Sequence, residues 1–156
     1  MTKYNEVQKT FTAYRQAQRE YWNDLQDKVA AVASGFSQFL GVDLAPSGDG
    51  KYVEFGRKSG NQFERCHARE LETWRLELEF ALQILVEENE QKHPKERLIV
   101  SMSVERREGE YQFKIEHSDG KWYVQVPRSF EPSDQEELYQ ALLELTLQHY
   151  DPNIFG

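Results

Sequence analysis

The sequence predicts an α+β fold, in which an antiparallel meander sheet of about five strands is covered on one face by a long N-terminal helix and a C-terminal helix. Three observations predict it. Apolar residues recur every three or four positions over residues 1–40 and again over 133–150, which is the period of a helix. Over residues 51–127 apolar and polar residues alternate, which is typical of strands with one buried face. Turns containing glycine separate the alternating runs.

The composition indicates a single domain over residues 1–156. Hydrophobic residues make up 38% and aromatic residues 13% of the chain, which excludes a disordered or low-complexity protein. The 19 lysines and arginines against 27 aspartates and glutamates give a net charge of −8, which argues against direct nucleic-acid binding and against an anionic membrane surface. One cysteine, no apolar leader and no long apolar run lead us to expect a cytoplasmic protein.

The first segment, residues 1–40, predicts a helix that is too long for its domain. Its apolar spacing shifts once, between Leu25 and Val29, and Gly41 stands where a C-terminal cap is expected. At 1.5 Å per residue the helix would be about 57 Å long, whereas a domain of this size is about 30–40 Å across. The helix must therefore bend near Gly35, break, or project so that its first half packs on a second copy.

Aromatic residues are concentrated at the start of this helix. Tyrosine and tryptophan are common interface anchors because they bury a large area at a low entropic cost. The aromatic residues either cover the sheet of their own subunit or contact another protein, and the length of the helix favours the second alternative. We therefore predict a homodimer or another protein–protein interface formed by Tyr4, Phe11, Tyr14, Tyr21 and Trp22.

The first part of the sheet is the hardest to predict. Residues 51–58 alternate like a strand and are followed by a turn at 59–61, whereas residues 62–72 fit a helix or a strand. Residues 73–86 place an apolar residue at every even position but consist largely of strong helix formers. We predict a strand there, because a helix would leave half of the apolar residues on the wrong face.

The rest of the sheet and the last helix follow clearer signals. Residues 98–104, 111–115 and 122–126 alternate, with reversals at 108–109 and 118–120, and Pro127 ends the sheet. The last helix is predicted to begin at Ser133, where Ser133 and Glu136 have the spacing of a capping box, and Pro152 follows its end.

Sequence motifs of common enzymes are absent. The chain contains no glycine-rich phosphate loop, no His-Glu-x-x-His or Cys-x-x-Cys metal motif and no Gly-x-Ser-x-Gly nucleophile elbow. We therefore expect no metal and no cofactor and favour a non-enzymatic protein. Most catalytic sites leave no short local signature, however, so an enzyme is not excluded.

The most reactive pair of neighbours is Cys66 and His67. Adjacent side chains diverge on both strands and helices, so this histidine cannot activate this thiol. Glu64 and His67 have the spacing of one half of a di-iron site, but the other half is missing. The alternative function that these residues leave open is an enzyme or a small-ligand-binding protein, with a pocket between helix and sheet formed by Arg65, Cys66, His67 and Arg69.

The leading prediction is a small acidic binding protein, such as an adaptor, a chaperone-like factor or an inhibitor. Residues 131–156 contain six acidic residues and no lysine or arginine, and an acidic surface of this kind attracts a basic partner. A second alternative is a nucleic-acid mimic, whose carboxylates take the places of phosphates at the similar spacing of alternate strand residues. Its candidate carboxylates are Glu72, Glu77, Glu79, Glu87, Glu88 and Glu90.

Overall fold

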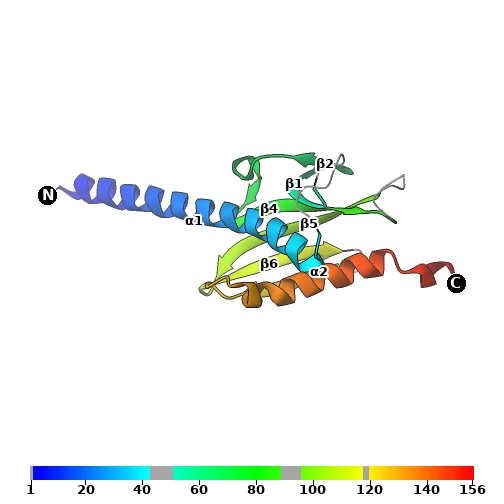
Figure 1. The fold of residues 1–156 in the computed structure, drawn as a ribbon. Helices are drawn as coiled ribbons and strands as arrows, with labels where there is room; N and C mark the ends of the chain where they lie inside the picture. Colours follow the sequence, from blue (N-terminus) through cyan, green and yellow to red (C-terminus); the bar gives the residue numbers. More distant parts are fainter. Residues whose placement is uncertain (1, 43–50, 89–95, 118–119) are drawn as a thin grey trace.

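The computed structural model describes residues 2–42, 51–88, 96–117 and 120–156 and confirms the α+β class. Two α-helices, α1 (Lys3–Leu40) and α2 (Glu136–His149), lie beside one antiparallel sheet (Figure 1). Its strands are β1 (Val53–Ser59), β2 (Gln62–Arg65), β3 (Thr73–Trp74), β4 (Glu77–Val86), β5 (Glu96–Arg107), β6 (Glu110–His117) and β7 (Gly120–Val126). The sheet thus has seven strands rather than about five, because the short strands β2 and β3 come from segments that the sequence left ambiguous or joined to β4.

The strands follow the order β2-β1-β4-β5-β6-β7, with β3 paired to β4 beside this path. Every pairing is antiparallel, and β5, β6 and β7 form the predicted meander. The register places Val104 opposite Phe113 and Phe113 opposite Val124, so the apolar residues of neighbouring strands share one face. That face forms the core together with the two helices.

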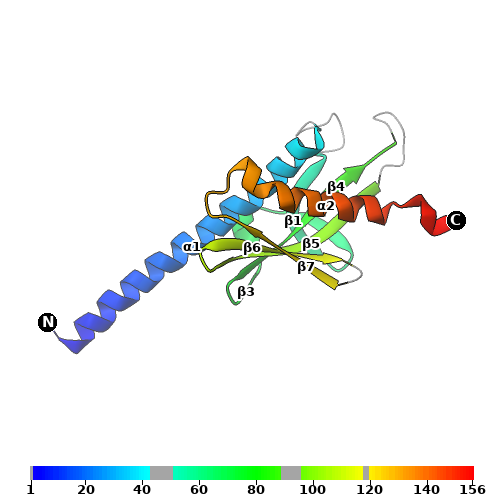
Figure 2. The same ribbon diagram turned by 90° about the horizontal axis from the view of Figure 1, so that it is seen from below.

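Only the second half of α1 packs on the sheet. The helix is continuous from Lys3 to Leu40 and is not interrupted at Gly35. Figure 2 shows that its first half extends well beyond the sheet. Leu25, Val29, Val32 and Phe36 are fully buried in the second half. The structure therefore shows an uninterrupted helix whose first half projects from the domain.

Helix α2 packs on the same apolar face and against α1. Leu138 and Leu142 are fully buried, and the ring of Tyr139 stacks on that of Phe36 with centroids 6.0 Å apart. The two helices approach closely because Gly35 has no side chain: a Cβ there would lie 2.0 Å from the Tyr139 hydroxyl oxygen.

The predicted single strand over 73–86 is wrong in its first four residues. The chain reverses at residues 75–76, where Arg75 adopts a left-handed backbone conformation with φ 57°, and β3 folds back on β4. Trp74 and Leu76 are consequently exposed, each at 59%, although they continue the alternating pattern. From Leu78 to Ile84 the alternation does describe one buried strand face.

The predicted start of the last helix is also wrong. A 3-10 turn at Pro132–Gln135 precedes α2, whose N-cap is Gln135 without a side-chain capping bond. Asp134 accepts hydrogen bonds from the Glu131 amide and the Ser129 hydroxyl, so the capping interaction forms two residues earlier than Ser133 and Glu136 would place it. Part of the predicted turn at 118–120, residues 118–119, lies outside the described residues.

Candidate interaction surface

The first half of α1, residues 3–20, forms what we call the arm. Every residue from Thr2 to Glu20 is exposed. A capping box begins the helix, in which the Asn5 amide donates to the Thr2 hydroxyl (3.1 Å) and the Thr2 amide donates to the Asn5 side chain (3.1 Å). The arm is thus a helix supported by local contacts rather than by the core.

Four large apolar side chains form a stripe along the arm. Tyr4, Val7, Phe11 and Tyr14 are 58–68% exposed and follow spacings of three, four and three residues, which place them on one helix face. The guanidinium of Arg15 lies 5.9 Å from the centre of the Phe11 ring. A contiguous exposed apolar stripe is typical of a surface that binds something.

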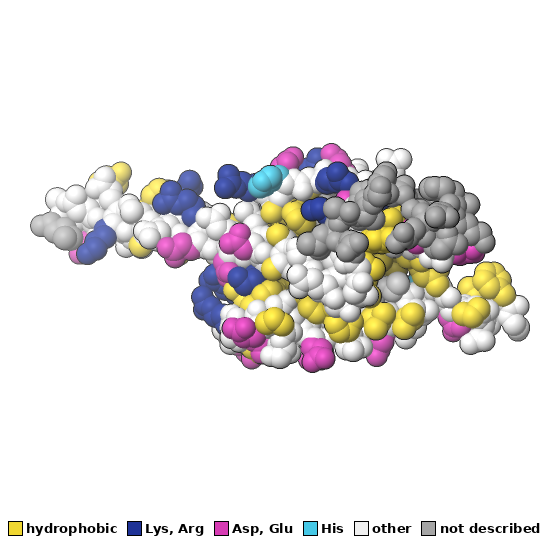
Figure 3. Space-filling view, viewed as in Figure 1, with side chains coloured by type: hydrophobic (Ala, Val, Ile, Leu, Met, Phe, Trp, Pro, Cys, Tyr) yellow, Lys and Arg dark blue, Asp and Glu magenta, His cyan; other side chains and the backbone are white. Residues whose placement is uncertain are grey.

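The arm and the rest of the chain carry opposite net charges. Residues 1–20 contain four cationic and two acidic side chains, a net charge of +2. Because the whole chain has a net charge of −8, residues 21–156, which we call the body, carry −10. Figure 3 shows cationic and apolar side chains interleaved along the projecting arm.

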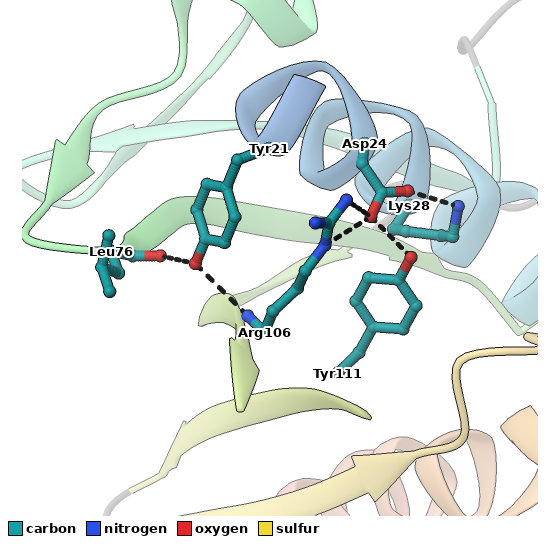
Figure 4. Close-up of polar contacts among 6 residues, drawn as sticks. All are labelled: Tyr21, Asp24, Lys28, Leu76, Arg106 and Tyr111. Carbon is teal, nitrogen blue, oxygen red and sulfur yellow. Dashed lines mark hydrogen bonds and ion pairs between the residues drawn. The ribbon is translucent and has the colours of Figure 1, made fainter. Parts of the chain in front are cut away.

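The arm meets the body at a group of polar contacts that we call the anchor cluster, formed by the side chains of Tyr21, Asp24, Lys28, Arg106 and Tyr111 and the backbone of Leu76 (Figure 4). The Tyr21 hydroxyl donates to the Leu76 carbonyl oxygen (2.5 Å) and accepts from the Arg106 amide (3.3 Å). The Arg106 guanidinium lies 5.3 Å from the centre of the Tyr21 ring. Burial raises the pKa of Tyr21, so the hydroxyl keeps the proton that it donates.

Asp24 is the centre of the anchor cluster. Its carboxylate accepts from Nε and Nη2 of Arg106 (2.9 and 2.6 Å), from the Tyr111 hydroxyl (2.6 Å) and from Lys28 (2.9 Å). Burial by itself would raise the pKa of Asp24, but the hydrogen bonds from Tyr111, Lys28 and Arg106 outweigh it and lower the pKa. These contacts tie α1 to β5 and β6 and fix the direction in which the arm leaves the body.

The apolar surface of the arm continues onto the body at the β3–β4 hairpin. Tyr21 follows Tyr14 by seven residues, on the same helix face, and contacts the backbone of Leu76. The exposed side chains of Trp74 and Leu76 therefore lie near the end of the stripe. Figure 1 places this hairpin beside the middle of α1.

The structure divides the predicted interface residues into two groups. Tyr4, Phe11 and Tyr14 lie on the arm, with exposed rings. Tyr21 and Trp22 are partly buried and pack against the core of their own subunit. Sequence reasoning missed Asp24 and its partners because Arg106 and Tyr111 lie more than eighty residues away along the chain, and only the spacing of Asp24 and Lys28 was a local signal.

The predicted ligand residues lie at the end of β2 and in the segment that follows it. Arg65 donates two hydrogen bonds to the buried carboxylate of Glu54 (2.8 and 3.0 Å), and His67 and Arg69 are exposed. Burial raises the pKa of Cys66, which lowers the fraction of reactive thiolate. The structure thus places Arg65 in an ion pair and Cys66 in surroundings that favour the protonated thiol.

Two shallow hollows occur elsewhere on the surface. One, of about 350 Å³, is lined by groups of both charges, among them Lys58, Glu79 and Lys114. The other, of about 460 Å³, lies between β5 and the end of α2. None of Arg65, Cys66, His67 and Arg69 lines either hollow. Among the described residues, no three His, Cys, Asp or Glu side chains are grouped so that they could hold a metal ion.

Two carboxylates of the predicted nucleic-acid mimic are engaged within the chain. Glu77 lies 3.5 Å from the Lys114 ammonium, and Glu87 accepts a hydrogen bond from Tyr52 (2.7 Å). Glu90 lies outside the described residues. These two of the six candidate carboxylates are therefore not free to take the places of phosphates.

Comparisons with protein-family models, with curated proteins and with solved structures found no match to this chain. Within the described residues, no helix combines the length and the apolar character needed to cross a membrane.

Proposed function

We propose that this chain is a non-enzymatic binding protein, an adaptor that contacts another protein chain through its arm. The observation that carries the proposal is the stripe of four large side chains, each at least 58% exposed, on a helix half that lies outside the core. Exposed apolar residues scattered singly are ordinary, whereas a contiguous stripe that continues onto Trp74 and Leu76 is a surface of interface size.

The stability of the arm supports the same proposal. Most of the stability of a helix in a protein comes from packing of its apolar face, and the arm has no such packing within its own chain. The arm contains Val7, Thr10 and Thr12, which are weak helix formers because their branched side chains lose freedom in a helix. A protein partner that covers the stripe would supply the packing that the body does not.

The charge of the body supports a binding role and a limited set of partners. A body with a net charge of −10 attracts basic proteins at long range and repels nucleic acids and anionic membranes. The proposal includes a cytoplasmic location, in which the single cysteine, Cys66, remains a free thiol.

The test is capture of protein partners by the full chain, in the wild type and in two matched variants. Tyr14→Glu places a charge on the stripe, and Gln16→Glu places the same charge two residues away on another face of the arm. We expect the wild type and Gln16→Glu to bind the same partner, which includes a second copy, and Tyr14→Glu to lose it. Equal binding by all three proteins, or no binding by any, would contradict the proposal.

A further inference from the structure

We infer that the partner of the arm is a second copy of this chain, paired antiparallel along the stripe. This inference rests on the proposed function and names the partner of the same surface. Antiparallel pairing of the two arms forms a two-fold symmetric contact, in which each copy contributes the same residues. The two bodies then lie at opposite ends of a paired helical rod.

The spacing of the stripe matches a pair of helices. With Gln18 and Tyr21, the stripe continues at three- and four-residue intervals over more than two heptads, which is the spacing of a two-helix seam. In the antiparallel register, Phe11 faces Tyr14 of the second copy and Val7 faces Gln18. Tyr4 then faces Tyr21, at the point where the opposite arm meets its body. Every layer of the seam therefore contains at least one large apolar side chain.

The residues beside the stripe are compatible with this register. Thr10 faces Ala17 of the second copy, and Gln8 faces Arg15, so neither of these two flanking layers brings like charges together. The strongly charged residues of the arm, such as Lys9 and Glu20, lie away from the seam. A helix can therefore approach the stripe without leaving buried charges unpaired.

The body argues against the parallel arrangement. Tyr21 lies in line with the stripe and is partly covered by Leu76 and Arg106, so the body occupies the seam side of α1 beyond that residue. Two parallel copies would bring both bodies, each with a net charge of −10, to the same place. In the antiparallel pair, Tyr4 of the second copy lies opposite Tyr21. Because α1 begins at Lys3, only one residue earlier, the second helix does not extend into the opposite body.

The area available is sufficient for a stable contact. The stripe together with Trp74 and Leu76 comprises six side chains that are 58–68% exposed. If each buries roughly 100 Å², a pair of copies buries about 1,200 Å², which is the lower end of specific interfaces. Trp74 and Leu76 take part because they lie beside Tyr21, where the arm meets the body and where the first residues of the opposite arm would pack.

The first test is the mass of the purified full chain in solution, by sedimentation equilibrium over a range of concentrations. We expect twice the monomer mass of 18.4 kDa for the wild type and for Gln16→Glu. Phe11→Glu and Tyr14→Glu should each weaken self-association about 30-fold or more, as expected for central interface residues. A wild-type monomer whose stripe still captures a different protein would overturn this inference and leave the proposed function standing.

The second test is the register, in chains that carry Cys66→Ala. Val7→Cys and Gln18→Cys chains are prepared separately, mixed and oxidised. Antiparallel pairing joins a Val7→Cys chain to a Gln18→Cys chain, whereas Gln18→Cys alone should form no covalent dimer. Disulfides between two Gln18→Cys chains, without the mixed product, would show parallel pairing and overturn the inference. Binding of the monomer to anionic vesicles through the stripe, without self-association, would also overturn it.

Discussion

The two halves of α1 share one helix and one apolar spacing but have different surroundings. In the second half, residues 21–40, Leu25, Val29, Val32 and Phe36 are fully buried against the sheet and α2. In the arm, residues 3–20, the corresponding side chains are at least 58% exposed. The change occurs at the anchor cluster, where Asp24 and Tyr21 fasten the helix to β5, β6 and the β3–β4 hairpin.

This contrast separates what an apolar pattern determines from what it leaves open. The period of the pattern fixes which helix face is apolar, because side chains three and four residues apart lie on one side. It does not fix what covers that face. In the second half the cover is the body of the same chain, and for the arm we propose a second copy.

The largest expected difference between the two halves concerns a matched pair of phenylalanines. Phe36→Ala should lower the free energy of unfolding by about 3–5 kcal/mol, because it opens a cavity at a fully buried side chain. Phe11→Ala should change it by less than about 0.5 kcal/mol in the monomer, because its side chain is 58% exposed. Urea denaturation at low protein concentration, where the chain is monomeric, measures both values. A large loss for Phe11→Ala would mean that the arm packs on its own body.

The next largest effect should come from Gly35→Ala. Alanine ordinarily favours a helix over glycine by about 0.5–1 kcal/mol. At Gly35, however, a Cβ would lie 2.0 Å from the hydroxyl oxygen of Tyr139 and 2.8 Å from the ring carbon that carries it. We expect the free energy of unfolding to fall by about 1–3 kcal/mol, as for other overpacked sites.

A second substitution checks this explanation of Gly35→Ala. Tyr139→Phe removes the nearest atom, so the double variant should be more stable than the sum of the two single effects predicts. Strict additivity in thermal or urea unfolding would show that the strain does not come from contact between α1 and α2.

The sequence was sufficient for the helices and for most of the sheet, because their patterns depend on spacing alone. It was insufficient where a backbone reversal or a distant partner decides the outcome. The even positions of residues 73–86 are apolar, which predicts one continuous strand. The left-handed conformation of Arg75 nevertheless turns Trp74 and Leu76 away from the core. Arg106 joins Asp24 across more than eighty residues, and no local pattern reports such a contact.

A smaller loss in the free energy of unfolding is expected from Asp24→Asn, which weakens the hydrogen bonds that hold α1 to the sheet between its two halves. Hydrogen bonds to a charged group contribute about 1.5–3 kcal/mol when buried, and the partial exposure of Asp24 reduces this to about 1–2 kcal/mol at neutral pH. Thermal and urea unfolding measure the loss. Asp27→Asn, an equal change of charge at an exposed position of the same helix, is the control.

The effect of Asp24→Asn should depend on pH in one direction. Because the folded-state pKa of Asp24 lies below its ordinary value of 3.8, its contribution to stability is present above pH 3.8 and is lost as the pH falls through the folded-state pKa. The gap in stability between wild type and Asp24→Asn should therefore close in acid. A gap that stays constant across this range would show that the charge of Asp24 does not stabilise the anchor cluster.

The smallest expected effect, and the most direct test of the boundary, comes from Thr2→Ala. The variant removes the hydroxyl that accepts from the Asn5 amide, and loss of such a cap costs a helix about 0.5–2 kcal/mol. Because residues 3–20 make few contacts with the core, we expect this cost to appear as faster hydrogen exchange of the arm amides alone. Amides around Val29 and Phe36 should exchange at the wild-type rate. Faster exchange in both halves would mean that α1 unfolds as one unit, and the arm would then depend on the body rather than on a partner.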